Sequence, residues 1–286
     1  MMAKNRVSVK RTVKVRVVTV STVVIFLALF LAGLSFGQTT GAFSQSPKTA
    51  AEAIDQLVWA DRILSVEGIF DFLGHISVRN PENSKTFFIS RAIAPETVTK
   101  NDILEVDFDG NVVTKTQFRP YQERIIHAGI YKARPDVNSV IHAHPIPVVT
   151  LSVSEVPFRI VTHPASIFYE GVPMYDEYDF KSPGNTGMLV TTKEEGDRVA
   201  KALGKSLAVI MRGHGCNVVG KSVPDAVRAA IDLRDNVVVL MGAQQFGKVK
   251  TVSYDEAKAA AAALGNPERG WNAWVSRVKR AMPDMK

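Results

Sequence analysis

Two histidines one residue apart, His142 and His144, are the residues of this chain best placed to do chemistry. The apolar segment 137–141 before them predicts a short buried strand, and Pro145 ends it because proline cannot donate a ladder hydrogen bond. Alternate residues of a strand point to the same face, so we expect both imidazoles to enter one small volume. Two converging imidazoles are suited to binding a divalent metal ion.

His214, in a Gly-His-Gly turn, is the natural third ligand. Three protein nitrogens with an open fourth position are typical of a catalytic metal site. These ligands alone do not fix which divalent metal is bound, because manganese, cobalt and iron accept imidazole as zinc does. A single histidine is more often a packed or solvent-exposed residue, but the pair together with this turn favours metal binding. Glu123 begins a predicted helix upstream, and its carboxylate is placed to act as a fourth ligand or as a general acid/base.

The composition indicates a globular protein and gives no sign of a nucleic-acid partner. Of the 286 residues, 46% are apolar and 22% are charged, which is ordinary for a globular protein. The formal net charge of +7 arises largely from residues 1–16, which carry six cations and no acid. We therefore predict no basic face on the rest of the chain and no nucleic-acid binding. The sole cysteine, Cys216, excludes an intrachain disulfide, so the core must hold the fold.

The N-terminal segment 1–37 predicts a signal peptide, because a basic start is followed by an apolar run over 17–36 and then by small residues. The alternative is an uncleaved membrane anchor, since about 20 apolar residues can cross a bilayer. The small residues favour cleavage and a periplasmic or secreted protein. In either case the N-terminal cations would keep the N-terminus in the cytoplasm, so we expect the rest of the chain to be exported. The polar segment 38–49 predicts a linker, and 50–286 a folded domain with C-terminal helices.

Periodicity and turn residues predict interleaved helices and strands along the folded domain. Apolar residues at helical spacing predict helices at 50–66, 123–132, 193–203, 224–246, 255–264 and 271–282, with a short helix or turn at 148–154. Alternating or short apolar runs predict strands at 74–79, 86–90, 103–107, 111–114, 137–144, 158–161 and 208–211, and segment 187–190 is predicted to lead into a further strand. Several strands pair through tight turns, which favours an α/β fold with a mixed, mainly antiparallel sheet and helices on both faces.

Four segments in this order resemble the class II aldolase/adducin family, and the resemblance runs over residues 50–252. The segments are Gly-His-Ile-Ser-Val-Arg at 74–79, Pro-Tyr-Gln-Glu at 120–123, the His-Ala-His pair and the Gly-His-Gly turn. The resemblance implies a three-layer α/β/α sandwich and a homotetramer with sites between subunits. It also implies zinc bound by His142, His144 and His214, with Glu123 as the residue that transfers protons.

Two departures from the family's sugar-phosphate members favour an unphosphorylated substrate. His75 stands where those members have asparagine, and Tyr121 and Gln122 replace a serine pair that holds phosphate. A phosphate site needs small hydroxyls and free N–H donors, so this loss argues against a sugar phosphate. The motif around His75 resembles instead the branch that acts on unphosphorylated, often aromatic, hydroxy acids, including by decarboxylation. The substrate contacts expected in that branch, with an arginine holding a carboxylate, are His75, Ser77, Arg79, Ser90 and Arg91.

The predicted function is therefore a zinc-dependent lyase of aldolase or decarboxylase type. Its predicted substrate is a small unphosphorylated hydroxy acid or hydroxy ketone. A sugar-phosphate aldolase or epimerase is the first alternative, since an epimerase would use the same metal with other acid/base residues. The second alternative is a non-catalytic adducin-like interaction module. Such modules lose metal ligands that this chain keeps, which counts against this alternative.

Overall fold

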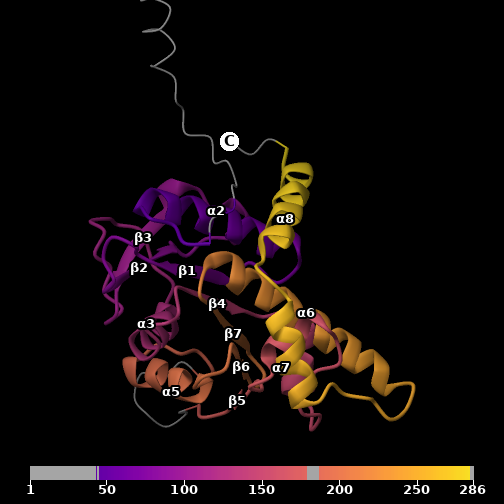
Figure 1. Ribbon diagram of the computed structural model, residues 1–286. Helices are drawn as coiled ribbons and strands as arrows, with labels where there is room; N and C mark the ends of the chain where they lie inside the picture. The colour runs from indigo at the N-terminus through magenta and orange to yellow at the C-terminus, as the bar shows by residue number, and fades with distance from the viewer. Residues whose placement is uncertain (1–42, 44, 179–186, 284–286) are drawn as a thin grey trace, which may run out of the picture. The chain divides into compact units, whose positions relative to one another are not determined.

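The computed structural model (Figure 1) describes residues 43, 45–178 and 187–283. The predicted signal peptide or anchor at 1–37 and the first residues of the predicted linker lie outside these ranges. Within them, no helix is both long enough and apolar enough to span a bilayer.

One mixed sheet runs through the described part of the chain, with its strands in the order β3-β2-β1-β4-β7-β6-β5. The strands are β1 (His75–Arg79), β2 (Thr86–Ser90), β3 (Ile103–Asp107), β4 (Ser139–Ala143), β5 (Met174–Tyr175), β6 (Ala208–Met211) and β7 (Gly215–Gly220). Neighbouring strands are antiparallel except for β5 and β6, which are parallel. The predicted mixed, mainly antiparallel sheet is confirmed.

Helices cover both faces of this sheet, as Figure 1 shows. Alternation along β4 directs Ile141 into the core on one face and Val140 into the core on the other. The first core receives side chains from α2 (Ala50–Val66), α4 (Ile146–Ser152), α6 (Val223–Gln244) and α8 (Glu268–Ala281). The second receives side chains from α3 (Arg124–Ala133) and α5 (Lys193–Leu203), which pack side by side. Helix α7 (Tyr254–Ala263) packs on the 3-10 segment Pro164–Phe168. The arrangement is the predicted α/β/α sandwich.

Local capping explains why several helices begin where the sequence predicts. The Thr49 hydroxyl accepts the Glu52 N–H at the start of α2, and the Ser222 hydroxyl accepts the Asp225 N–H at the start of α6. Gly68 adopts a φ of 67° just after α2, a conformation that ends a helix at little cost for glycine.

Three strand predictions are wrong. Residues 111–114 contribute only an isolated bridge between Val106 and Val112, so the turn at 109–110 opens no second ladder. Segment 187–190 is a turn followed by irregular chain.

Segment 158–161 is also irregular, and the cause is a side chain from α6. The buried Asn236 amide donates to the Arg159 carbonyl at 2.8 Å and accepts the Val161 N–H at 2.9 Å. These bonds satisfy backbone groups that a sheet ladder would otherwise take.

Candidate metal centre

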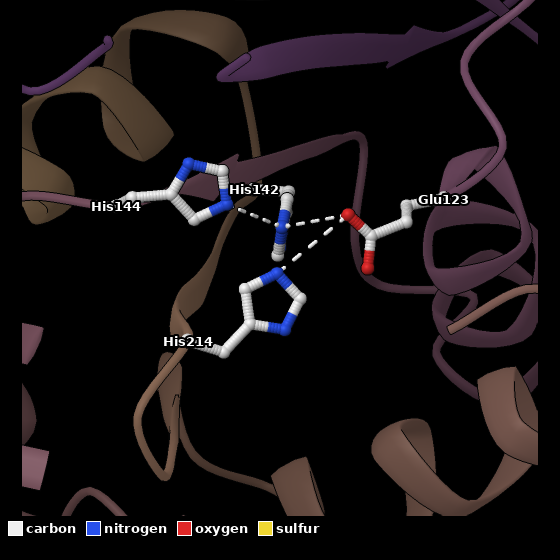
Figure 2. A group of neighbouring side chains, drawn as sticks. All are labelled: Glu123, His142, His144 and His214. Carbon is white, nitrogen blue, oxygen red and sulfur yellow. Dashed lines mark hydrogen bonds and ion pairs between the residues drawn. The ribbon is translucent and has the colours of Figure 1, made fainter. Parts of the chain in front are cut away.

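Four side chains bring one ligand-type atom each to the same point (Figure 2). His142 lies on β4, and His144 follows directly after that strand. His214 lies in the turn between β6 and β7, and Glu123 is the N-cap residue of α3. Their four donor atoms lie within 4.8 Å of one another. The structure thus brings together the three predicted metal ligands and the predicted proton-transfer residue.

The spacing of these atoms fits a metal ion. His142 Nε2 lies 3.0 Å from His144 Nε2 and 3.4 Å from Glu123 Oε2, which is 3.6 Å from His214 Nε2. Tetrahedral zinc with ligands at about 2.0–2.1 Å holds neighbouring donor atoms about 3.3 Å apart. Three imidazoles and a carboxylate are also donors that zinc accepts readily. The residues present therefore fit a divalent cation of this kind.

Two polar side chains orient His142 and His144 through their Nδ1 atoms, on the side of each ring that faces away from the cluster. His142 Nδ1 donates to Asn217 Oδ1 at 2.8 Å, and His144 Nδ1 lies 3.2 Å from both carboxylate oxygens of Asp71. Fixing the proton on Nδ1 leaves the Nε2 lone pair for a metal. His214 Nδ1 has no hydrogen-bond partner among the described residues, so the turn and its packing hold this ring.

The Glu123 carboxylate is buried and held in its charged form. Its Oε1 accepts the Val190 N–H at 3.0 Å, while Oε2 faces His142 and His214. Burial alone would raise the pKa of Glu123, but the two histidines outweigh it and hold the pKa well below its usual range. An anionic carboxylate beside the centre is able to take a proton from a bound substrate.

A cavity of about 890 Å³ opens onto the four-donor cluster. Glu123, His144 and His214 line it together with His75. Its other walls are mainly apolar and are made by Phe72, Leu73, Ala92, Ile93, Ala94, Pro120, Tyr121, Met188 and Leu189. The volume lies within the range of small-molecule sites. Tyr121 and Gln122, the two residues that replace the serine pair, both line this cavity.

His75 reaches the cavity at the end of a buried chain of hydrogen bonds. Its Nδ1 lies 2.9 Å from His127 Nε2, His127 Nδ1 lies 2.6 Å from Ser77 Oγ, and Ser77 Oγ lies 2.8 Å from the Tyr131 hydroxyl. Burial lowers the pKa of His127 to about 3 and lowers that of His75 well below its usual value. Both rings are therefore neutral at neutral pH, and the chain fixes the orientation of His75.

The other predicted substrate contacts do not line this cavity. The guanidinium of Arg79 donates to backbone carbonyls, among them those of Val137 and Tyr131. Arg91 forms an ion pair with Asp102 at 2.7 Å. Ser77 is fully buried in the chain behind His75, and Ser90 is fully buried beside Tyr121. Of the five predicted contacts, the structure places only His75 at the cavity wall.

Asp71 and Asn217 were not predicted from the sequence as members of the site. A weak signal existed for Asn217, because it is a polar residue beside the apolar pair Val218 and Val219, three residues after His214. Nothing comparable marks Asp71, which lies in an irregular segment far from His144 in the sequence.

The comparisons with known proteins agree with the fold and with the site. Residues 55–238 match the family model described as Class II Aldolase and Adducin N-terminal domain. The chain is 33% identical over 250 residues to decarboxylase tropJ of Talaromyces stipitatus, which covers 76% of this chain and 90% of the relative. It is 31% identical over 203 residues to a 3,4-dihydroxyphthalate decarboxylase of Arthrobacter keyseri, covering 66% of this chain and 77% of the relative.

Among solved structures, L-fuculose 1-phosphate aldolase from Glaciozyma antarctica PI12 superposes with a TM-score of 0.70. The alignment covers 84% of this chain and 96% of that protein, with 24% sequence identity, a level at which the likeness shows the fold alone. The family model, by contrast, spans more than half of the chain, and its residue range contains all four members of the donor cluster. This chain belongs to the class II aldolase and adducin N-terminal domain family.

Proposed function

We propose that this protein is a zinc-dependent decarboxylase of an unphosphorylated hydroxy acid, with His142, His144 and His214 as metal ligands. The observation that carries the proposal is the four-donor cluster at the wall of a mainly apolar cavity. The similarity to decarboxylases and aldolases supports a lyase. Four converging donor atoms, two of them on imidazoles whose Nδ1 atoms are hydrogen-bonded to Asn217 and Asp71, count against a non-catalytic module.

The cavity wall favours an unphosphorylated and aromatic substrate. The described lining residues include no serine or threonine, the small hydroxyls that a phosphate site uses. Apolar side chains such as Ile93 and Leu73 offer contacts to a ring. The named substrate of the Arthrobacter keyseri relative, 3,4-dihydroxyphthalate, is an acid of this kind.

The chain's own residues supply proton transfer and orientation. When bound, the metal would supply a Lewis acid that draws electron density from substrate oxygens beside the breaking bond. Glu123 Oε2 takes the proton of a substrate hydroxyl. The carbon–carbon bond then breaks, carbon dioxide leaves, and the electron pair stays on the substrate carbon. Glu123 returns its proton to that carbon, and solvent reprotonates the hydroxyl oxygen on release. His75, neutral and fixed through His127, contacts the substrate through its other ring nitrogen.

A substrate comparison on zinc-loaded protein tests this proposal. Dihydroxybenzoate-type acids and L-fuculose 1-phosphate would be supplied in parallel, and the release of carbon dioxide and of aldehyde would be followed. We expect metal-dependent carbon dioxide from at least one acid. Aldehyde from the sugar phosphate, with no carbon dioxide from any acid, would instead assign the aldolase reaction and overturn the proposal.

Export and a homo-oligomeric state are further parts of the proposal, the first supported by the N-terminal sequence and the second by the likeness to the family. The basic and apolar character of 1–37 supports export of the folded domain. N-terminal sequencing of the protein recovered outside the cytoplasm tests the cleavage, and an intact N-terminus in the membrane fraction would favour the anchor. Sedimentation analysis of the purified protein would give the number of subunits.

A further inference from the structure

Arg119 is the only lysine or arginine among the described residues that line the cavity. Its backbone is fixed, because its carbonyl accepts the Ala92 N–H at 2.9 Å and the next residue, Pro120, bridges to Arg91. Arg119 is also four residues before Glu123, so one short segment carries both the cation and the carboxylate. Arg119 therefore lines the cavity as an exposed residue, and the backbone that carries it is held by these contacts.

No carboxylate of the described chain pairs with this guanidinium. The two acids of the cavity wall are already engaged, since Asp71 holds His144 and Glu123 faces His142 and His214. Arg91 is held by Asp102, and its guanidinium lies 4.8 Å from the centre of the Phe118 ring. Among the described residues of the cavity wall, Arg119 is thus the cation that is free to bind an anionic group of a ligand.

The chemistry of decarboxylation decides which anionic group that is. A departing carboxylate loses its negative charge as carbon dioxide forms. A cation bound to it would stabilise the ground state more than the transition state and would slow the reaction. A carboxylate that stays on the product keeps its charge, so binding it to arginine lowers the energy of both states and improves affinity without that penalty. The planar guanidinium fork matches a carboxylate through two parallel hydrogen bonds.

We propose that Arg119 binds a second carboxylate of the substrate, one that is retained in the product, so that the substrate is a hydroxy diacid. This inference rests on the proposed decarboxylase function. It assigns to Arg119 the specificity role that the sequence had predicted for Arg79 or Arg91.

Ligand binding to the metal-loaded full chain tests the inference. The probes are catechol, 3,4-dihydroxybenzoate and 3,4-dihydroxyphthalate, which share the two hydroxyls and carry no, one and two carboxylates. Dissociation constants would be measured by calorimetry in chains that also carry E123Q, so that the diacid is bound without being decarboxylated. The chains compared would have Arg119 unchanged, R119A, R119K or the control R159A, an exposed arginine outside the cavity. We expect the wild type to prefer the diacid over the monoacid, and R119A to bind the diacid about 10- to 100-fold more weakly. The affinity of R119A for catechol should differ from that of the wild type by less than about twofold. The diacid affinity of R119K should lie between those of the wild type and R119A, because lysine keeps the charge and lacks the planar fork.

Two results would overturn the inference. One is a diacid affinity that R119A leaves within about twofold of the wild type. The other is a loss in R119A that is equal for all three probes, which would indicate damage to the site. A carbon dioxide assay on the same Arg119 variants with Glu123 intact separates the failure of this inference from the failure of the proposed function. Wild-type protein that releases carbon dioxide while R119A keeps its diacid affinity refutes the role of Arg119 alone. Wild-type protein that holds no metal and decarboxylates no acid refutes both.

Discussion

Replacing Asn217 by alanine should weaken metal binding, although Asn217 is not one of the proposed metal ligands. Asn217 is fully buried, and its Oδ1 accepts the His142 Nδ1–H at 2.8 Å. Without it a buried N–H loses its partner, at a cost of about 1–3 kcal/mol, and the ring loses the bond that fixes its tautomer. Loss of such a backing hydrogen bond typically reduces metal affinity about 10- to 100-fold.

A competition titration against a chelator of known zinc affinity would measure this change. The matched control is V219A, because Val219 is two residues further along β7 and buried, and lies outside the donor cluster. V219A should lower the free energy of unfolding and leave zinc affinity within about twofold of the wild type, while N217D, which keeps an acceptor, should retain binding. Wild-type zinc affinity in N217A, or an equal loss in V219A, would refute the reasoning.

Three further perturbations probe the chemistry, the fold and its pH dependence. E123Q should retain bound metal and lose about 10²- to 10⁴-fold in turnover, and full activity in a carbon dioxide assay would remove Glu123 from the mechanism. G215A should destabilise the protein by about 1–3 kcal/mol and weaken zinc binding, because the added Cβ would overlap the Ala143 carbonyl oxygen beside His144, and unchanged urea unfolding would contradict this close approach. Burial raises the pKa of Asp232 to about 6, so its proton favours the folded state below about pH 4 and that contribution is lost as pH rises through 6. As the pH rises from 4 to 7, the free energy of unfolding of D232N should therefore increase relative to that of the wild type, by up to about 3 kcal/mol. Urea unfolding that gives the same difference between the two proteins at pH 4 and at pH 7 would count against this prediction.

Local signals in the sequence were sufficient for much of the fold. The bounds of α2, α5, β2, β3 and β6 are confirmed as predicted, because caps, glycine stops or short apolar runs mark each of them. Strand β7 was not predicted, because the glycines at its two ends, Gly215 and Gly220, are typical of turns. The segment forms a strand through its pairing with β4 and β6, which the local sequence does not show.

The donor cluster could be predicted because its residues carry their chemistry in their types and spacing. The substrate contacts could not, because an arginine in the sequence does not show which acceptors surround it. Arg79 is hydrogen-bonded to backbone carbonyls, and Arg91 forms an ion pair with Asp102. Arg119 lies in an irregular segment, where no periodic pattern in the sequence distinguishes it. Such assignments depend on tertiary contacts between segments far apart in the chain.

The metal content of the purified protein tests the central claim most directly. After mild purification, elemental analysis of the wild type should give about one equivalent of divalent metal per chain, with zinc predominant. The variant H142A should give much less, because it removes the ligand at the centre of the cluster, where His144 and Glu123 both contact it. Less than about a tenth of an equivalent in wild-type protein that stays metal-free when zinc is supplied would contradict the account.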